Sequence, residues 1–389
     1  MSDTLRESLR AIAVRLETTS GTDPIGGTPA VSDYIGATFT FSISQDAVEN
    51  PEESGSLDVP APIATGLRGA VEIRVPLRGS GVAATAPEWG RLLQVCGWRE
   101  TVNAAAVGAP TAATAGSATT VTLGAIFGTT AQQYRGFPLL ITGTPANALS
   151  FITDYTAGRV ATLADTFAPP LAATALCQIP PCVVYSPTSD EALFRTATVY
   201  LYEDGLRHRL VGCVGSWRLE LEAGRPGALI FSLRGQVLDA YQAAPLPAAW
   251  NTIARQPLPL WLAGKCQFNR ATARTDAFRF DAGVALQDIE NPEAVQGYDP
   301  PIMSARAARG DLAPYATTTH SPGRFAALVG ASSVPFASSL GSLAGNRIGF
   351  CMPSNRIASM DRTKRGELGA DQITIRPDLG DAAAFIAHF

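Results

Sequence analysis

Acidic side chains are the first groups in this sequence that could do chemistry, because Glu49 and Glu52 have a spacing that suits an acid and base pair. An enzyme needs such a pair in a cleft, a nucleophile with its base, or a metal cluster. The same pair recurs as Glu290 and Glu293. A repeated turn or contact explains two copies of one spacing more simply than catalysis does, so we interpret these carboxylates as structural.

Histidine and cysteine lack the spacing of a metal or catalytic site. The three histidines, His208, His320 and His388, are far apart and belong to no motif, so we expect ordinary surface or strand positions. Cys177 and Cys182 have no second pair at zinc-ligand spacing beside them. We therefore expect buried thiols, no metal and no cofactor, and we predict that the protein is not an enzyme.

Phosphate-binding features are weak as well. The segment Gly79-Ser80-Gly81 lacks the lysine of a phosphate loop, which indicates a turn. Four arginines could form a basic patch: Arg195, Arg207, Arg209 and Arg218. Four carboxylates are interleaved with them: Glu203, Asp204, Glu220 and Glu222. This mixture favours salt bridges between subunits over a DNA-binding groove, although it could also line a channel.

Composition indicates a multidomain globular protein with a surface of low charge. The chain has 389 residues, of which 46% are hydrophobic and 16% charged, and its formal net charge is -4. So few charges suggest that much of the surface contacts neighbouring subunits, and the acidic balance excludes tight binding to phosphates. Residues 1–4 do not start a secretion signal and no apolar run is long enough to insert in a membrane, so we expect assembly in the cytoplasm.

A repeat in the sequence predicts two related domains. Residues 49–70 and 290–311, at a shift of 241, share nine identities in twenty-two positions without a gap. An alternating segment precedes each copy, and a helix candidate with an early proline follows it, at 86–95 and at 321–329. We therefore expect the same structural unit twice.

Strand patterns give the fold class. Val71, Ile73 and Val75 alternate with charged residues, and 217–233 reads as a hairpin with a looser counterpart at 357–376. We predict a mainly β protein with two duplicated domains of β-sandwich or barrel type and short helices. The first domain is discontinuous, at 1–102 and 182–245, and the second covers 250–389.

The interval 103–181 has a different composition. It is rich in Ala, Thr and Gly, carries almost no charge, and has no counterpart in the second half. Loops tolerate inserted domains, and an unfolded interval of this length would leave backbone groups without partners. We therefore predict an inserted small β domain on the outer surface.

The order of several modest motifs resembles the tail tube proteins of siphophages, the major tail protein family. The resemblance covers most of 8–240 and, less closely, 255–380, and these segments carry it: 14–24, 79–81, 86–97, 185–189, 200–212, 215–217 and 344–348. Separately, 134–143, 152–155 and 160–163 resemble a small β module of phage structural proteins.

The resemblance implies a tube subunit whose strands join those of its neighbours in a closed inner barrel. With two tube domains per chain, three chains would form a pseudo-hexameric ring, and rings would stack head to tail. The implied partners are further copies, the tape measure protein in the lumen, tail terminator and distal tail or baseplate proteins, and DNA in transit. Loops 44–70 and 285–312 would join stacked rings, and the location would be the virion tail.

Two other classes of function remain open at this point. Another phage structural protein, such as a tail terminator, a baseplate ring or a capsid decoration protein, can also use β-rich domains with insertions. A hydrolase or carbohydrate-binding module in 103–181 would need an aromatic platform, and this interval contains no tryptophan.

Overall fold

The computed structural model describes residues 5–52, 55–143 and 147–389, so residues 1–4 and part of the loop 44–70 lie outside the described residues. Strands make up 50% of the chain and helices 6%, which confirms the mainly β expectation. The described residues hold two α-helices, α1 (Gly90–Gln94) and α2 (Ser321–Val329), both within the segments predicted as helical. Among the same residues, no helix is long and apolar enough to cross a bilayer. Three short 3-10 helices are also present: η1 (Val31–Asp33), η2 (Glu191–Leu193) and η3 (Ala248–Thr252).

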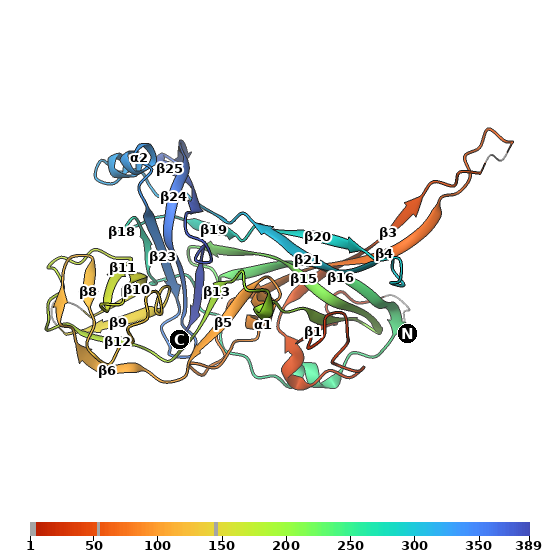
Figure 1. Cartoon of the computed structure of the whole chain (residues 1–389), viewed down its shortest axis with the longest axis horizontal. Coiled ribbons are helices and arrows are strands. Elements are labelled where there is room, and N and C mark those ends of the chain that lie inside the picture. The colour runs from red at the N-terminus through yellow and green to blue at the C-terminus, as the bar shows by residue number, and fades with distance from the viewer. Residues whose placement is uncertain (1–4, 53–54, 144–146) are drawn as a thin grey trace.

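An antiparallel sheet of eight strands runs through both halves of the chain (Figure 1). In order of pairing, these strands are β3 (Thr38–Val48), β4 (Ile63–Pro76), β16 (Ala228–Ala243), β15 (Leu206–Glu222), β19 (Ala277–Asp281), β22 (Arg309–Leu312), β25 (Leu368–Pro377) and β24 (Ile348–Arg365). The first four strands form one unit and the last four form another, and the pairing of β15 with β19 joins them.

The two four-strand units have the same topology. In each unit the order across the sheet is the first, second, fourth and third strand of that unit in the chain. Phe39 lies opposite Ile73 in the first unit, and Phe278 lies opposite Leu312 in the second. The expected hairpins at 217–233 and 357–376 are present as β15–β16 and β24–β25. Origin by duplication stays a prediction.

Nine further strands fold over one face of the eight-strand sheet. They are β1 (Arg10–Leu16), β2 (Tyr34–Ile35), β5 (Trp98–Asn103), β13 (Cys182–Pro187), β14 (Ala197–Glu203), β17 (Cys266–Phe268), β18 (Ala271–Thr272), β23 (Val334–Leu340) and β26 (Phe385–His388). The large side chains Trp98, Trp217 and Phe280 are buried between the layers, and the ring centroid of Trp217 lies 5.1 Å from that of Trp98 and 5.0 Å from that of Phe280. Because Trp217 belongs to the first unit and Phe280 to the second, the two units share one core.

The interval 103–181 forms a seven-stranded sheet of its own at one end of the molecule (Figure 1). Its strands are β6 (Val107–Ala112), β7 (Ala115–Gly116), β8 (Thr120–Thr122), β9 (Pro138–Thr142), β10 (Ala148–Tyr155), β11 (Val160–Leu163) and β12 (Leu176–Ile179). The two ends of the interval meet, because Asn103 pairs with Cys182. Its core also contains Phe385 and Phe389, so this module packs on the second half of the chain. The domain boundaries stay predictions.

The two repeated sequence segments end in hairpins with different surroundings. Residues 44–67, which we call the arm, continue β3 and β4 away from the body of the molecule (Figure 1). In the second half, β20 (Val284–Glu290) and β21 (Tyr298–Arg306) form the corresponding hairpin, which lies along the body and contacts β15 and β16. The motif of Glu49 and Glu52 follows β3, and that of Glu290 and Glu293 begins at the end of β20.

Candidate functional surface

The face of the eight-strand sheet that points away from the core is polar. On β4, Val71, Ile73 and Val75 are at most 2% exposed, whereas Glu72 and Arg74 are exposed, because successive side chains point to opposite faces. The same alternation on the next strands places further charged residues on this face, which we call the polar face: Arg218, Glu220, Glu222, Arg279, Asp281, Arg309 and Asp311.

Ion pairs on the polar face reach across a whole strand. Arg74 on β4 lies 2.9 Å from Glu220 on β15, and Arg218 on β15 lies 3.2 Å from Glu72 on β4. The strand between them, β16, contributes Ile230, which stays only 5% exposed although it points to the polar face. The arginine stems that span the strand shield this apolar side chain from water.

Opposite charges nearly balance on the polar face between β4 and β22. The residues named above comprise four arginines and five carboxylates. Exposed pairs of this kind contribute only about 0–1 kcal/mol each to stability. Their main physical effect is a hydrated surface with little net field, which gives a polyanion such as DNA no strong binding site.

The eight-strand sheet has two open edges in the described part of the chain. β3 pairs only with β4, and β24 beyond Asn355 pairs only with β25. An open edge presents unpaired N–H and C=O groups that can pair with another chain. The β24 edge is basic, since it carries Arg356, Arg362, Lys364 and Arg365 against a single carboxylate, Asp361.

The junction of β15 with β19 shows how two four-strand units join edge to edge. Leu219 lies opposite Phe280, and both are 1% exposed on the core side. On the polar face, Arg218 lies opposite Asp281 and Glu220 lies opposite Arg279. Opposite charges and large apolar residues in directly facing positions both stabilise cross-strand pairing.

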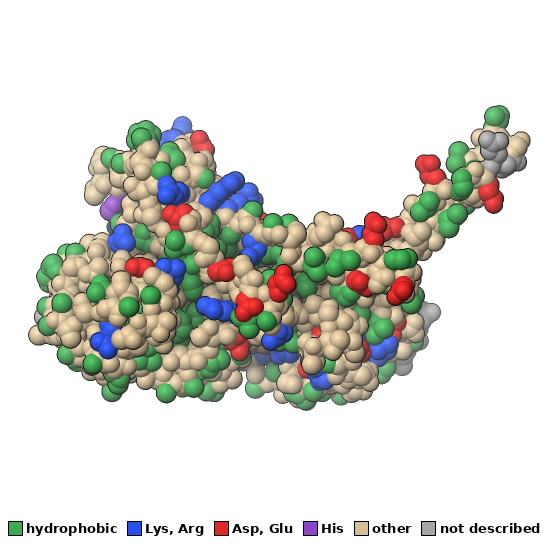
Figure 2. Space-filling model, in the orientation of Figure 1, with side chains coloured by type: hydrophobic (Ala, Val, Ile, Leu, Met, Phe, Trp, Pro, Cys, Tyr) green, Lys and Arg blue, Asp and Glu red, His purple; other side chains and the backbone are tan. Residues whose placement is uncertain are grey.

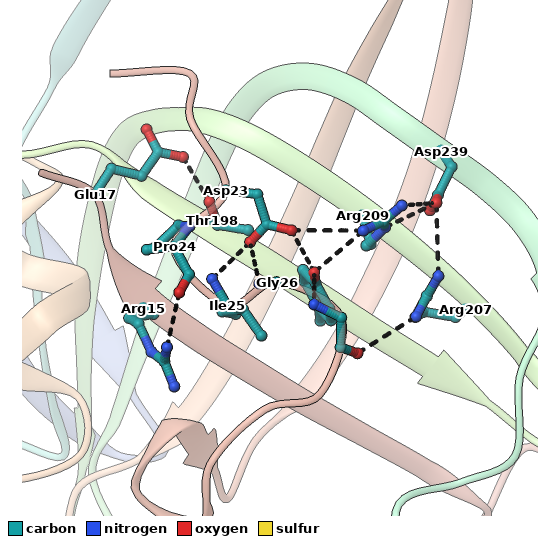
Figure 3. Close-up of polar contacts among 12 residues, drawn as sticks. Arg15, Glu17, Asp23, Pro24, Ile25, Gly26, Thr198, Arg207, Arg209 and Asp239 are labelled. Atoms are coloured by element: carbon teal, nitrogen blue, oxygen red, sulfur yellow. Dashed lines mark hydrogen bonds and ion pairs between the residues drawn. The ribbon is translucent and has the colours of Figure 1, made fainter. Parts of the chain in front are cut away.

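Arg207 and Arg209, two of the four arginines of the predicted basic patch, belong to a network within one chain (Figure 3). On β15, Arg209 pairs with Asp239 through Nε at 2.8 Å and contacts Asp23, while Arg207 lies 3.6 Å from Asp239. The Tyr200 hydroxyl donates a hydrogen bond to Asp23 and accepts one from the Gly27 amide. These contacts fix the loop around 20–30 on β14 and β15.

Arg207, Arg209 and Arg218 already have carboxylate partners within the chain, and salt bridges between subunits at this patch stay a prediction. These partners lie on strands distant in sequence. Arg195 donates to the backbone oxygens of Ala192 and Phe194 instead.

Glu17 is a buried carboxylate that the motif analysis did not find. It is 6% exposed, and its two oxygens accept four hydrogen bonds, from Thr196, Thr198, Gly21 and Gly212 at 2.6–2.8 Å. Figure 3 shows the contact with Thr198. No sequence signal identifies Glu17, since nothing near it in sequence except Gly21 touches its side chain.

The glycine segment considered as a phosphate loop joins the two halves of the chain. The amide of Gly79 donates to Asn346 Oδ1 at 2.7 Å, and the amide of Gly81 donates to the Gly345 oxygen at 2.9 Å. A Cβ on Gly79 would overlap the Gly345 oxygen, and Gly345 itself has a φ of 76°. Both segments thus need glycine because their backbones touch, and no phosphate explanation is required.

The histidines occupy two kinds of place. His208 on β15 and His388 on β26 are fully buried, and burial lowers the pKa of each imidazole. His208 stacks on Phe41 with ring centroids 4.6 Å apart, and its Nδ1 accepts a hydrogen bond from the Tyr241 amide. His320 is exposed just before α2.

The remaining candidates do not come together. Cys177 and Cys182 are buried free thiols on β12 and β13, and burial raises their pKa to about 11 and about 12. No group of three or more metal-ligating side chains occurs among the described residues. The two glutamate pairs lie exposed at the ends of different hairpins.

Comparison with known proteins gives no family for this chain. No protein-family model matches it, and no curated protein is significantly similar to it in sequence. The function is therefore inferred from the polar face, the two open edges and the junction between the units.

Proposed function

We propose that this protein is a structural subunit of a bacteriophage tail tube, in which copies close into rings that stack around a channel. One observation carries the proposal: the β15–β19 junction already joins two four-strand units of the same topology, and the joined pair still has an open edge at each end. A second copy placed with β3 beside β24 would repeat that junction. The tube role follows from this geometry together with the order of motifs in the sequence.

Ring closure supplies a physical reason for the open edges. Three copies would bring six four-strand units into one closed sheet with pseudo-sixfold symmetry, and closure leaves no strand edge exposed. Head-to-tail stacking of such rings is an open association that produces a filament. The module at 103–181 would then lie outside the barrel.

The polar face would line the channel. The nearly balanced charges between β4 and β22 suit a wall along which DNA moves without being held, because a strongly basic wall would retain the phosphates. The tape measure protein would fill this lumen before ejection, and tail terminator and distal tail or baseplate proteins would bind the two ends of the tube. Assembly would take place in the host cytoplasm, and the final location would be the virion tail.

Electron microscopy of the purified protein at several concentrations tests this function directly. Stacked rings or tubes with three outer knobs per ring are the expected result. Single closed rings that never stack would favour a tail terminator or a baseplate ring, and isolated monomers at every concentration would point to a capsid decoration protein.

The edge pairing can be tested at one residue pair. When the two units are superposed by strand pairing, with Ile73 at the position of Leu312, Met360 takes the position of Trp217. Thr363 therefore takes the position of Glu220. Glu220 faces Arg279, and the equivalent of Arg279 on β3 is Thr40. We expect Thr40 of one copy to face Thr363 of the next.

A chain with Thr40→Cys and Thr363→Cys should form disulfide-linked oligomers, since facing Cβ atoms in antiparallel strands are about 4.5–5.5 Å apart. Non-reducing electrophoresis after mild oxidation measures the product, with up to three linked chains expected. A chain with Thr40→Cys and Thr272→Cys is the control, because Thr272 is exposed on β18 away from the edge. Equal cross-linking of both chains would contradict the predicted register.

A further inference from the structure

The β20–β21 hairpin packs on a site formed by β4 and β16 of its own chain, which we call the seat. Gln236 on β16 donates to the Tyr298 oxygen at 2.6 Å, and the Leu67 amide donates to Gln296 Oε1 at 2.8 Å. Arg68 on β4 pairs with Asp288 of the hairpin and stacks its guanidinium over the Tyr298 ring. The second unit's hairpin is thus held by the first unit.

The arm has the same elements, but most of its described residues are exposed. Asp46 is skipped in the β3–β4 pairing as Asp288 is in the β20–β21 pairing, so both are bulge residues. Val48 and Ile63 are 57% and 52% exposed, although apolar side chains on a paired strand usually cover something. Glu52 and its neighbour Glu49 are exposed and have no charged partner among the described residues.

Three arginines lie in a row on the second unit, and one of them, Arg376, has no ion pair among the described residues. Arg376 on β25 lies opposite Arg356 on β24. Because Gly310 pairs with Ile375 in antiparallel strands, the preceding residue Arg309 lies opposite Arg376 on its other side. The three arginines therefore form one row across the polar face. Directly facing like charges destabilise a sheet. Arg356 lies 3.5 Å from Asp378, and Arg309 approaches Asp311 only to 3.8 Å; both arginine side chains remain 56% exposed.

A groove of about 670 Å³ adjoins this arginine row. Its lining includes Arg309, Arg376 and the apolar residues Pro377 and Leu379. Arg309 is the residue that the sequence repeat aligns with Arg68, which holds the β20–β21 hairpin on the first unit. In the strand register that places Thr40 at the position of Arg279, Arg309 takes the position of Ala70, two residues along β4 from Arg68, so the groove lies next to the counterpart of the occupied seat.

We infer that the arm of one copy lies in this groove of a second copy, with Glu49 and Glu52 facing Arg309 and Arg376. The inference rests on the proposed ring assembly, which would place β3 of one copy beside β24 of the next. The chain's own arm cannot fill the groove, because it extends from the opposite end of the molecule (Figure 1). Figure 2 shows acidic side chains along the arm and basic side chains gathered near β25, which is the complementarity that such a contact needs.

Charge reversal tests the contact. Glu49→Lys with Glu52→Lys should raise the concentration for half-maximal assembly by more than about tenfold, and so should Arg309→Glu with Arg376→Glu. A chain that carries all four changes should return to within about threefold of the unmodified protein. The measurement is light scattering against concentration, with circular dichroism to verify folding of each variant. As a matched control, Glu290→Lys with Glu293→Lys changes the same motif in the seated hairpin and should not be restored by the arginine reversal.

Cross-linking gives a second test that does not alter folding. Chains with Glu49→Cys mixed with chains with Arg376→Cys should yield linked heterodimers with a short bismaleimide, whereas Glu293→Cys in place of Glu49→Cys should not. The native thiols do not compete, since five of the six are buried and burial raises the pKa of Cys266, the remaining one, to about 12.

The outcomes separate this inference from the proposed function. Rings that form with the Thr40–Thr363 disulfide but without the Glu49–Arg376 cross-link would overturn this inference, but they would still support the proposed ring assembly. Reversal of Arg309 and Arg376 that abolishes retention on double-stranded DNA and leaves assembly unchanged would overturn it in favour of a nucleic-acid contact. A protein that stays monomeric at every concentration overturns both.

Discussion

A single carboxylate, Glu17, holds three segments of the first unit together. Its oxygens accept hydrogen bonds from the loop at Gly21, from Thr196 and Thr198 at the start of β14, and from Gly212 on β15. Each oxygen takes one hydroxyl donor and one backbone N–H. A buried group that satisfies so many donors is costly to change, because the donors lose their only partner.

Glu17→Gln should destabilise the protein by about 2–4 kcal/mol. A threonine hydroxyl can rotate to accept from the new amide nitrogen, but the backbone N–H that faces it cannot, so one buried donor is left without an acceptor. Urea denaturation followed by tryptophan fluorescence measures the loss. Glu49→Gln is the control and should change the unfolding free energy by less than about 0.5 kcal/mol, because Glu49 is exposed. Equally small changes in the unfolding free energy of both variants would show that the hydrogen bonds of Glu17 are not needed for stability.

Residue-scale features were the hardest to predict from sequence. The partners of Glu17 on β14 and β15 are 179–195 residues away, and local patterns carry no information over such distances. His208 was expected at an ordinary surface or strand position beside Arg207 and Arg209, and it lies on β15. The short contact of Gly79 with Asn346 was missed, although both of their segments had been singled out for the order of motifs.

At the scale of elements, strands and hairpins could be predicted but their non-local partners could not. Alternation along β4 and the turn between β15 and β16 depend on neighbouring residues, so both were found. The β15–β19 junction and the pairing of β13 with β26 connect segments that are far apart, and only the folded chain reveals them. The topology shared by the two units agrees with the repeat without establishing its origin.

Shortening the arm should separate folding from association. Replacing residues 49–62 by Asn-Gly would leave a two-residue hairpin turn between Val48 and Ile63, which face each other. The thermal unfolding midpoint should change by less than about 2 °C, because the described residues of this segment are mostly exposed, while assembly should require a more than about tenfold higher concentration. Calorimetry and light scattering measure the two effects. A large fall in the midpoint would mean that the arm supports the monomer.

At the scale of the whole molecule, the module at 103–181 is connected to the first half of the chain but packs on the second half. Asp165 pairs with Lys265, and Phe151 packs beside Gly349 on β24. Phe385 and Phe389 belong to the core of the module although they lie at the other end of the sequence. The module therefore covers apolar surface that the second half would otherwise expose to water.

Removal of the module should harm the rest of the protein. Joining Asn103 to Cys182 through Asn-Gly is sterically simple because the two residues already pair. The shortened chain should unfold at least about 5 °C lower and aggregate, since Phe385 and Phe389 lose their cover. Adding Phe385→Ser and Phe389→Ser to the same chain should restore solubility. An unchanged midpoint in differential scanning calorimetry would show that the module is an independent attachment.

The strand-spanning ion pairs of the polar face have a consequence for ionic strength. A guanidinium that already has a carboxylate at 2.9–3.2 Å, as Arg74 and Arg218 do, holds few counterions of its own. Such paired guanidiniums would neutralise few phosphates of a passing polyanion, so it would release few of its own counterions, and this release is what makes attraction between DNA and proteins depend on salt. Friction along such a wall would therefore be nearly the same in a dilute medium as in the concentrated interior of a cell.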